Sequence, residues 1–371
     1  MNRDSFAHQL KRLPALITLV VTYFAVQAAA AHPDFIETVY SENVYPFIRN
    51  AVSAVTRLVP FSVAEAIVGI LALLFIVFFL VRLIRLLMFK SRAFVRFVSL
   101  IITVVLTASA FITLFYLMWG FNYFRMPLDE KLALPEREYT AAEIKAVCKE
   151  LAYKASIKRA ELEENESGVF SAELENLLDG VREAYAEIGL TKPELSADVP
   201  PAKPLATSSL FSDLGISGIY IPFTEEPSFN RDEPCLFIPF NTAHETAHYL
   251  GWAHEEDANF IAFLVGISSK DAALNYSSCM HGLNHLMRVL RSADNEGASE
   301  VYSIYSDAMR RDLADYSEYY NAHDTSARET SDKVNDAYLK INKQEKGVLS
   351  YEEDVALILR YFDSIGFFEN L

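Results

Sequence analysis

Two histidines four residues apart, His244 and His248, have the spacing in this sequence that is best suited to chemistry. Positions i and i+4 of an α-helix lie on the same face, so both imidazoles can bind a single Zn²⁺ ion. Glu245 follows the first histidine directly, and a carboxylate at that position can act as a general base toward a water molecule. We therefore predict a helix that begins near Thr242 and carries a zinc site, with Glu245 as the catalytic residue.

The pattern His-Glu-x-x-His also arises by chance, and these residues have a purely structural interpretation. Thr242 and Glu245 are three residues apart, as in a capping box, where Glu245 would only close the first turn of a helix. A catalytic zinc site needs a third protein ligand and one open position. The residues downstream of His248 therefore decide between the two interpretations.

His254 is one candidate for the third ligand. From His244 to His254 the sequence has the spacing of the metzincin peptidases, and Gly251 would permit the sharp turn that this spacing requires. Metzincins also carry a methionine turn beneath the metal. The downstream methionines lie in sequence with a helical pattern, which disfavours His254: Met280, Met287 and Met309.

Glu255 is the candidate that we favour as third ligand, beside the two histidines. The run from Glu255 to Asn259 resembles the Glu-x-x-Ala-Asp element of membrane metallopeptidases related to the CAAX-prenyl endopeptidases, with asparagine in place of aspartate. In those enzymes the glutamate lies on a second helix and is the third ligand, as in gluzincins. The sequence after Asn259 continues a helix that would present Glu255 in its first turn. Glu256 and Asp257 remain as alternatives.

The elements that must position these residues begin near Pro135, where charged amphipathic sequence replaces apolar sequence. Thr140 is a suitable N-cap for a helix with apolar residues at helical spacing, and a second helix is predicted over 171–188. The apolar positions of the first helix are Ile144, Val147, Leu151 and Ala152. Both helices belong to a predicted zincin-like domain over residues 121–371.

Short strands are expected between these helices and the histidine motif. Pro-rich sequence over 193–204 indicates a loop, and the segments 218–223 and 235–238 are rich in β-branched and aromatic residues, which is typical of strands. Helical sequence returns at Asn241 and continues to the end of the chain. The predicted fold class is therefore mostly α, with an α+β outer domain that contains a small sheet. Residues 218–223 are also the natural candidate for a strand along which an extended peptide could bind.

Three apolar stretches near the N-terminus are long enough to cross a bilayer as helices. They lie at about 13–31, 63–87 and 97–119, and we predict that residues 1–120 form a three-helix transmembrane bundle. The first stretch also resembles a signal peptide, because basic residues precede it and alanine-rich sequence ends it. The two further stretches favour a multi-pass arrangement.

The distribution of charge predicts the orientation of these spans. Up to Gly120 the chain has 10 basic and 5 acidic residues, and the rest has 23 basic and 44 acidic. Basic residues collect in cytoplasmic loops, and here they precede the first span and separate the second from the third. The second group is Arg82, Arg85, Lys90, Arg92 and Arg96. We expect a cytoplasmic N-terminus, an extracytoplasmic C-terminal domain, and an aromatic belt at the outer interface made by Tyr116, Trp119, Tyr123 and Phe124.

Composition also limits the partners of the chain. Its 371 residues carry a formal net charge of −16, with the acidic excess in the second part, which argues against nucleic acid because phosphate binding requires a basic surface. The three cysteines are too few and too scattered for a disulfide framework or a four-cysteine zinc site. Cys148, Cys235 and Cys279 are best interpreted as buried small side chains, although one pair could form a bridge.

Nearly the whole chain resembles the bacterial membrane proteins grouped as domain of unknown function 3810, which have N-terminal spans and an outer domain with a His-Glu-x-x-His motif. The matching segments are 39–41, 45–46, 60–62, 119–123, 222–224, the histidine motif with Gly251, Glu255 and Ala258-Asn259, and 334–336, 338–339, 347–348 and 350–351. The resemblance implies a zinc-dependent peptidase of the zincin type, with Glu255 as the shared ligand. It implies no particular substrate.

We predict a membrane-anchored zinc-dependent metallohydrolase, a peptidase that acts on a peptide or another cell-envelope substrate at the bacterial cell membrane. His244, His248 and Glu255 would hold Zn²⁺, and Glu245 would be the general base. The alternative is a non-catalytic membrane-anchored binding or scaffold protein that retains a zincin fold. Tyr249, His281 and His285 are available as oxyanion stabilisers, but each is better explained as a surface or core residue, and we assign none of them. Asn335, Tyr338 and Tyr351 could support the site, but helix packing is the favoured explanation for them.

Overall fold

The computed structural model describes residues 17–88, 93–195, 197–342 and 354–371. Within these ranges the chain divides into two compact units. One contains residues up to 56, residues 63–126 and residues 222–224, and the other contains the rest. Several sequence predictions lie outside the described residues, namely the start of the first span at 13–16 with the basic residues before it, Lys90 and Arg92, and the segments 347–348 and 350–351.

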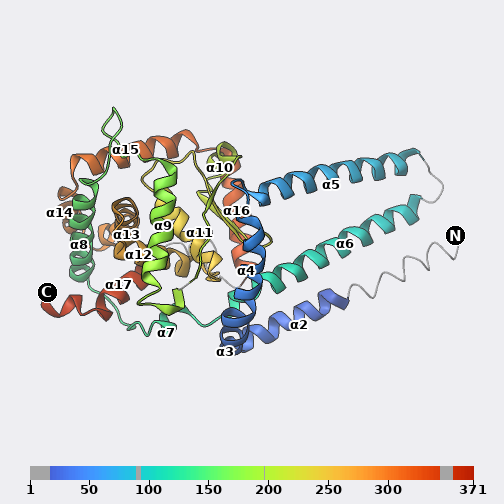
Figure 1. The fold of residues 1–371 in the computed structure, drawn as a ribbon, viewed down its shortest axis with the longest axis horizontal. Coiled ribbons are helices and arrows are strands. Elements are labelled where there is room, and N and C mark those ends of the chain that lie inside the picture. Colours follow the sequence, from blue (N-terminus) through green and yellow to red (C-terminus); the bar gives the residue numbers. More distant parts are fainter. Residues whose placement is uncertain (1–16, 89–92, 196, 343–353) are drawn as a thin grey trace. The chain divides into compact units, whose positions relative to one another are not determined.

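The first unit is entirely helical in its described part, apart from short connections (Figure 1). Its elements are α2 (Ile17–Ala31), α3 (Pro33–Phe35), η2 (Ile36–Val44), α4 (Tyr45–Thr56), α5 (Val63–Met88), α6 (Ala93–Met118) and η3 (Gly120–Phe124). The helix η2 has the wider π-type winding.

Two helices of this unit are long and apolar enough to cross a membrane, over Val63–Arg85 in α5 and Phe97–Met118 in α6. The predicted apolar helices at 63–87 and 97–119 are thereby confirmed. A third span results only if α2 and the segment Pro33–Thr56, which meet at an angle of 102°, count as one. None of the apolar window of α5 is buried within the protein. Such a surface needs an apolar environment, which lipid provides.

A buried ion pair ties η2 to the segment that follows α6. Arg125 donates from Nε and Nη2 to both carboxylate oxygens of Glu37, at 2.9 and 2.7 Å, and both side chains are about 95% buried. Beside this pair, Ser41 Oγ donates to Asn122 Oδ1 at 2.8 Å. A bidentate geometry is the arrangement in which a buried arginine–carboxylate pair best offsets the cost of desolvation.

The aromatic residues at the end of α6 do not form the predicted belt at a membrane interface. Tyr116, Trp119, Tyr123 and Phe124 are all buried. The rings of Trp119 and Tyr123 meet edge to face, and Tyr116 stacks on Phe124. Their apolar surface is covered by protein, so they form part of the core of this unit.

The second unit contains most of the helices and the only sheet in the described part of the chain. Its helices are α7 (Leu128–Lys131), α8 (Ala141–Arg159), α9 (Leu174–Ile188), η4 (Pro193–Leu195), α10 (Ser208–Asp213), α11 (Ile238–Tyr249), α12 (Glu255–Ser268), α13 (Ala272–Ala293), α14 (Asn295–Ser303), α15 (Asp307–Ala322), α16 (Ser326–Ile341), α17 (Asp354–Ser364) and η6 (Phe367–Asn370). Its strands are β1 (Lys203–Pro204), β2 (Gly218–Ile221) and β3 (Glu226–Phe229). The chain is therefore mostly helical with a small sheet, as predicted.

Helix α8 begins as its sequence predicts. Thr140 and Glu143 form a full capping box, and the predicted apolar positions of this helix are all buried. At its other end, Arg159 forms a buried ion pair with Asp312 of α15 at 2.5 Å, and Tyr276 of α13 donates to the same carboxylate at 2.7 Å. These contacts join three helices that are far apart in the sequence.

The sheet has the order β1-β3-β2, with β1 parallel and β2 antiparallel to β3. The predicted strand at 218–223 is confirmed over its first four residues as β2. The predicted strand at 235–238 is wrong, because residues 235–237 form a turn and Ile238 begins α11. Pro239 in the first turn of that helix fits there without loss of a hydrogen bond. The true partner strand, β3, contains Pro227, which masked it in the sequence.

Candidate metal centre

Helix α11 carries the histidine motif, and it begins one turn earlier than predicted, at Ile238 in place of Thr242. Thr242 is therefore inside the helix, and its Oγ1 is among the buried atoms without a hydrogen-bond partner in the described chain. The capping-box interpretation of Glu245 is wrong, because neither residue is at the helix start. Another role must account for a buried glutamate in the middle of this helix.

A tight turn after α11 brings the chain back onto the second histidine. Gly251 has a positive φ of 88°, and its N–H donates to the carbonyl of His248 while the N–H of Trp252 donates to that of Ala247. This pattern is the Schellman motif, which favours glycine at the left-handed position. The turn places the Trp252 carbonyl 2.7 Å from Nδ1 of His248. Nδ1 must be the donor in this hydrogen bond, which leaves Nε2 of His248 as the ring nitrogen that could coordinate a metal.

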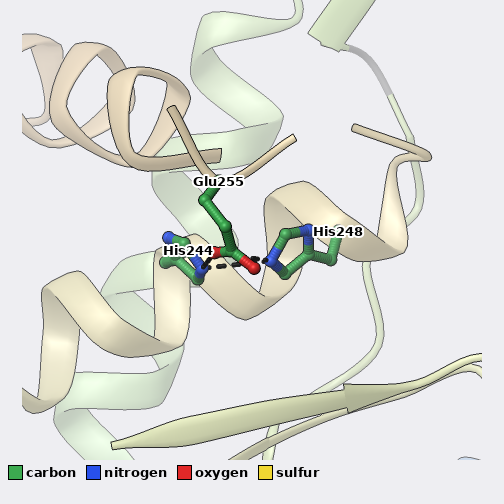
Figure 2. A group of neighbouring side chains, drawn as sticks. All are labelled: His244, His248 and Glu255. Carbon is green, nitrogen blue, oxygen red and sulfur yellow. Dashed lines mark hydrogen bonds and ion pairs between the residues drawn. The ribbon is translucent and has the colours of Figure 1, made fainter. Parts of the chain in front are cut away.

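Helix α12 starts four residues after this turn and delivers the third side chain. His254 is its N-cap and Glu255 its first residue. Figure 2 shows the Glu255 carboxylate pointing between the imidazoles of His244 and His248. Its Oε2 lies 3.1 Å from Nε2 of His244 and 3.6 Å from Nε2 of His248, and the two Nε2 atoms are 3.0 Å apart. All three side chains are buried.

These separations match the requirements of a tetrahedral metal site. Ligand atoms about 2.0–2.2 Å from a tetrahedral zinc are roughly 3.3 Å from one another, and the three separations fall on either side of that value. Two imidazole nitrogens that face each other without a shared proton repel through their lone pairs, and Oε2 of Glu255 lies against both of them. A cation among the three atoms would satisfy all of them.

Glu245 lies beside this group without contributing an atom to it. The backbone N–H of Tyr220 in β2 hydrogen-bonds its carboxylate, and Oε2 is buried without a hydrogen-bond partner in the described residues. The close approach depends on Gly218, where a Cβ would be only 2.7 Å from both Cγ and Oε1 of Glu245. Oε2 of Glu245 is thus available to accept a proton beside the three converging side chains of His244, His248 and Glu255.

The charges in this cluster act strongly on one another. Burial raises the pKa of the Glu245 carboxyl to about 7, although both imidazoles oppose the change. Burial also lowers the pKa of His248, but the Glu255 carboxylate outweighs it and raises that pKa to about 9. Burial would raise the pKa of Glu255, yet the same imidazoles hold it below its ordinary range. Two carboxylates therefore face two imidazoles in a site that favours a cation.

The other residues considered as third ligand lie outside the cluster. Nδ1 of His254 is 3.7 Å from Oε1 of Glu256, and neither residue is in the group of converging donors, nor is Asp257. The three methionines named in the metzincin comparison lie in helices, in α13 and α15. The structure thus brings Glu255 to the histidines and keeps His254 apart.

The remaining sequence candidates are placed as follows. Tyr249 is buried and donates to the carbonyl of Asp198 at 3.3 Å, while Asn335 and Tyr338 lie in α16. His281 and His285 pair with Asp354, which the sequence did not indicate. Two contributors to the centre were also missed, the Trp252 carbonyl and the Tyr220 backbone, because main-chain groups leave no residue-type signal.

Another buried carboxyl, that of Glu233, lies just before α11. Asn241 Nδ2 donates to its Oε2 at 2.6 Å. Burial raises the pKa of Glu233 to about 7, although Ser217 and Asn241 donate to it and Arg328 is nearby. As the pH rises, the carboxyl of Glu233 loses its proton in the unfolded chain before it does so in the folded one. The free energy of unfolding therefore falls between about pH 4.5 and pH 7 and stays at the lower value above pH 7.

Glu233→Gln is expected to remove this destabilisation, because glutamine stays neutral at every pH and keeps a hydrogen-bonding partner for Asn241. The gain is roughly 3 kcal/mol at most above pH 7. Thermal unfolding of the full chain in detergent measures it. The variant should unfold several degrees above the wild type at pH 8, and the difference should shrink at pH 5. An equal difference at both pH values would contradict the raised pKa.

Comparison with known proteins places the chain in a family. A family model described as Protein of unknown function (DUF3810) matches residues 40–359. No curated protein and no solved structure is significantly similar to the chain. The match covers most of the chain, including the two long apolar helices α5 and α6 and the helices α11 and α12 that carry the candidate site. The chain therefore belongs to the family described as Protein of unknown function (DUF3810).

Proposed function

We propose that this protein is a membrane-anchored zinc-dependent hydrolase, of the peptidase class, with a zincin-like outer domain. The observation that carries the proposal is the convergence of His244, His248 and Glu255 on one point, with the unpaired oxygen of Glu245 beside it. Two imidazoles and one carboxylate are a donor set of catalytic zinc sites, which keep a fourth position open. A fully saturated structural site would need a fourth protein ligand, and the described residues add none to this group.

His244, His248 and Glu255 would hold Zn²⁺, which when bound supplies a Lewis acid that polarises a substrate carbonyl and acidifies water. The hydrogen bond to the Trp252 carbonyl orients His248 and fixes its tautomer. Glu245 accepts a proton from the attacking water at its free oxygen and passes that proton to the leaving amine. Its burial at 6% exposure keeps bulk water from competing for that proton.

An extended peptide is the substrate class that the neighbouring sheet favours. β2 is the outer strand in the order β1-β3-β2, so it pairs on one side only among the described strands. Its backbone reaches Glu245 at Gly218 and Tyr220. A peptide added along this edge would form main-chain hydrogen bonds regardless of its side chains and would bring its backbone carbonyl to the centre.

The helices α5 and α6 would anchor the protein in the bacterial cell membrane. Basic residues collect between these helices, and the positive-inside rule places that connection in the cytoplasm. With α5 and α6 both crossing, everything from Gly120 onward is extracytoplasmic. The substrate would then be a peptide or another component of the cell envelope.

The experiment that tests this proposal measures metal content and peptide cleavage on the full chain in detergent. Wild-type protein is expected to cleave members of an unstructured peptide library, as read by mass spectrometry. A chelator should stop the cleavage and added Zn²⁺ should restore it. The double variant His244→Ala/His248→Ala should carry one zinc equivalent fewer than the wild type and cleave nothing.

Two results would contradict different parts of the proposal. If the double variant keeps the zinc content of the wild type, these histidines are not ligands. If the double variant holds one zinc equivalent fewer than the wild type, but the wild type cleaves no peptide, the chain is a binding or scaffold protein that retains the site. His323→Gln provides a matched control, because His323 is also an imidazole paired with a carboxylate, Asp213, at 2.8 Å, but no third donor joins that pair among the described residues.

A further inference from the structure

A second group of two histidines and a carboxylate is present in the outer domain. His281 and His285 are four residues apart in α13, so both imidazoles project from the same face. Asp354, the first residue of α17, lies against them. Nε2 of His281 is 3.1 Å from Oδ2 of Asp354, and Nδ1 of His285 is 2.9 Å from Oδ1. One donor atom from each residue falls within 4.8 Å of the others.

The burial of Asp354 requires that its charge be compensated. Its side chain is fully buried, while those of His281 and His285 are 14% and 11% exposed. Among the described residues its ion-pair partners are these two imidazoles, with no lysine or arginine. Buried carboxylates in proteins are paired with a cation or bind a metal.

This group repeats the architecture of the centre at α11. In both, two histidines four residues apart on one helix meet a carboxylate from the first turn of another helix. The contacts between carboxylate and imidazole are 2.9 and 3.1 Å here and 3.1 and 3.6 Å at Glu255. The two imidazoles also remain partly exposed, so an ion can enter and water can complete its coordination.

The geometry points to a second divalent-metal site at His281, His285 and Asp354, separate from the centre at α11 and suited to Zn²⁺. Mixed imidazole and carboxylate ligands are a set that zinc accepts, and the ion would place positive charge beside the buried Asp354 carboxylate. Binding joins the start of α17 to α13. It also holds His281, whose ring stacks at 3.6 Å on Phe240, one helical turn before His244 in α11. The second metal thereby supports the helix that carries the first.

Zinc stoichiometry of the full chain tests the second site. The protein in detergent is stripped with a chelator, reloaded with Zn²⁺, desalted and analysed by mass spectrometry of the metal. Wild type is expected to hold two equivalents. His285→Gln and Asp354→Asn should each hold one, because glutamine and asparagine keep hydrogen-bonding groups but are poor zinc ligands. The double variant His244→Ala/His248→Ala should also hold one, and the combination of that double variant with His285→Gln none.

The outcomes separate the two sites from each other and from a simple hydrogen-bonded cluster. The second site is overturned, and the first kept, if the wild type holds one zinc equivalent that His285→Gln keeps and the α11 double variant loses. The α11 centre is overturned instead if the wild type holds one zinc equivalent that His285→Gln loses and the α11 double variant keeps. His323→Gln should hold two equivalents. If Asp354→Asn fails to fold, His285→Gln decides the result, since His285 is partly exposed and tolerates a polar replacement more readily.

Discussion

Glu245→Gln is expected to lower the rate of peptide cleavage by roughly 10²–10⁴-fold, the usual contribution of a general base, and to leave the zinc content unchanged. Glutamine has the same shape, so it fits against Gly218 as glutamate does. Its amide cannot accept a proton from water, and the three converging side chains proposed as zinc ligands do not include residue 245. Steady-state cleavage of a peptide found in the library screen, with metal analysis of the same sample, gives both quantities.

Glu256→Gln is the matched control for this prediction. It removes the same charge eleven residues further on, beside His254 and outside the converging donors. We expect its cleavage rate to stay within a few-fold of the wild type. Full activity in Glu245→Gln would show that another group accepts the proton. Loss of zinc in that variant would instead mean that Glu245 belongs among the ligands.

Glu255→Ala is expected to remove one zinc equivalent and all peptide cleavage, whereas His254→Ala should keep both. Loss of a partner that only orients a ligand already costs about 10–100-fold in metal affinity, so loss of a ligand should cost more. Titration with a competing chelator measures the affinity. The physical reason is placement, because Glu255 Oε2 is 3.1 Å from His244 Nε2 while His254 faces Glu256.

Glu255→Asp is a useful companion to this pair. Aspartate keeps the charge but is one methylene shorter, so it should bind zinc more weakly than the wild type and more tightly than Glu255→Ala. A result in which His254→Ala loses the metal and Glu255→Ala keeps it would restore the metzincin arrangement. If both variants keep zinc equally well, the third ligand must be another group.

Local periodicity made several features predictable from the sequence. The N-cap at Thr140 and the apolar helices α5 and α6 depend on neighbouring residues, and the structure has them where expected. The prediction of a strand at 235–238 was wrong for a related reason, since a short apolar run with turns on both sides fits either a strand or the start of a buried helix. Pro239 was the local signal that favoured a helix start.

The prediction that the aromatic residues after α6 form a belt at the membrane interface was wrong for a different reason. Tyr116 and Trp119 follow an apolar helix, which is also the pattern of residues at a membrane interface. Whether such rings face lipid headgroups or protein depends on what packs against them, and here they pack on Tyr123 and Phe124. Burial of this kind is a property of the folded unit, and composition alone does not reveal it.

The sequence by itself determined that His244 and His248 share a helix face with Glu245 between them, because the helical period acts over four residues. Only the tertiary structure decided the third position. His254 and Glu255 are adjacent, and the turn at Gly251 and the start of α12 decide which one reaches the imidazoles. The same holds for His285 and Asp354, which are 69 residues apart. Their contact depends on how α17 packs against α13, and packing of distant elements leaves no trace in local spacing.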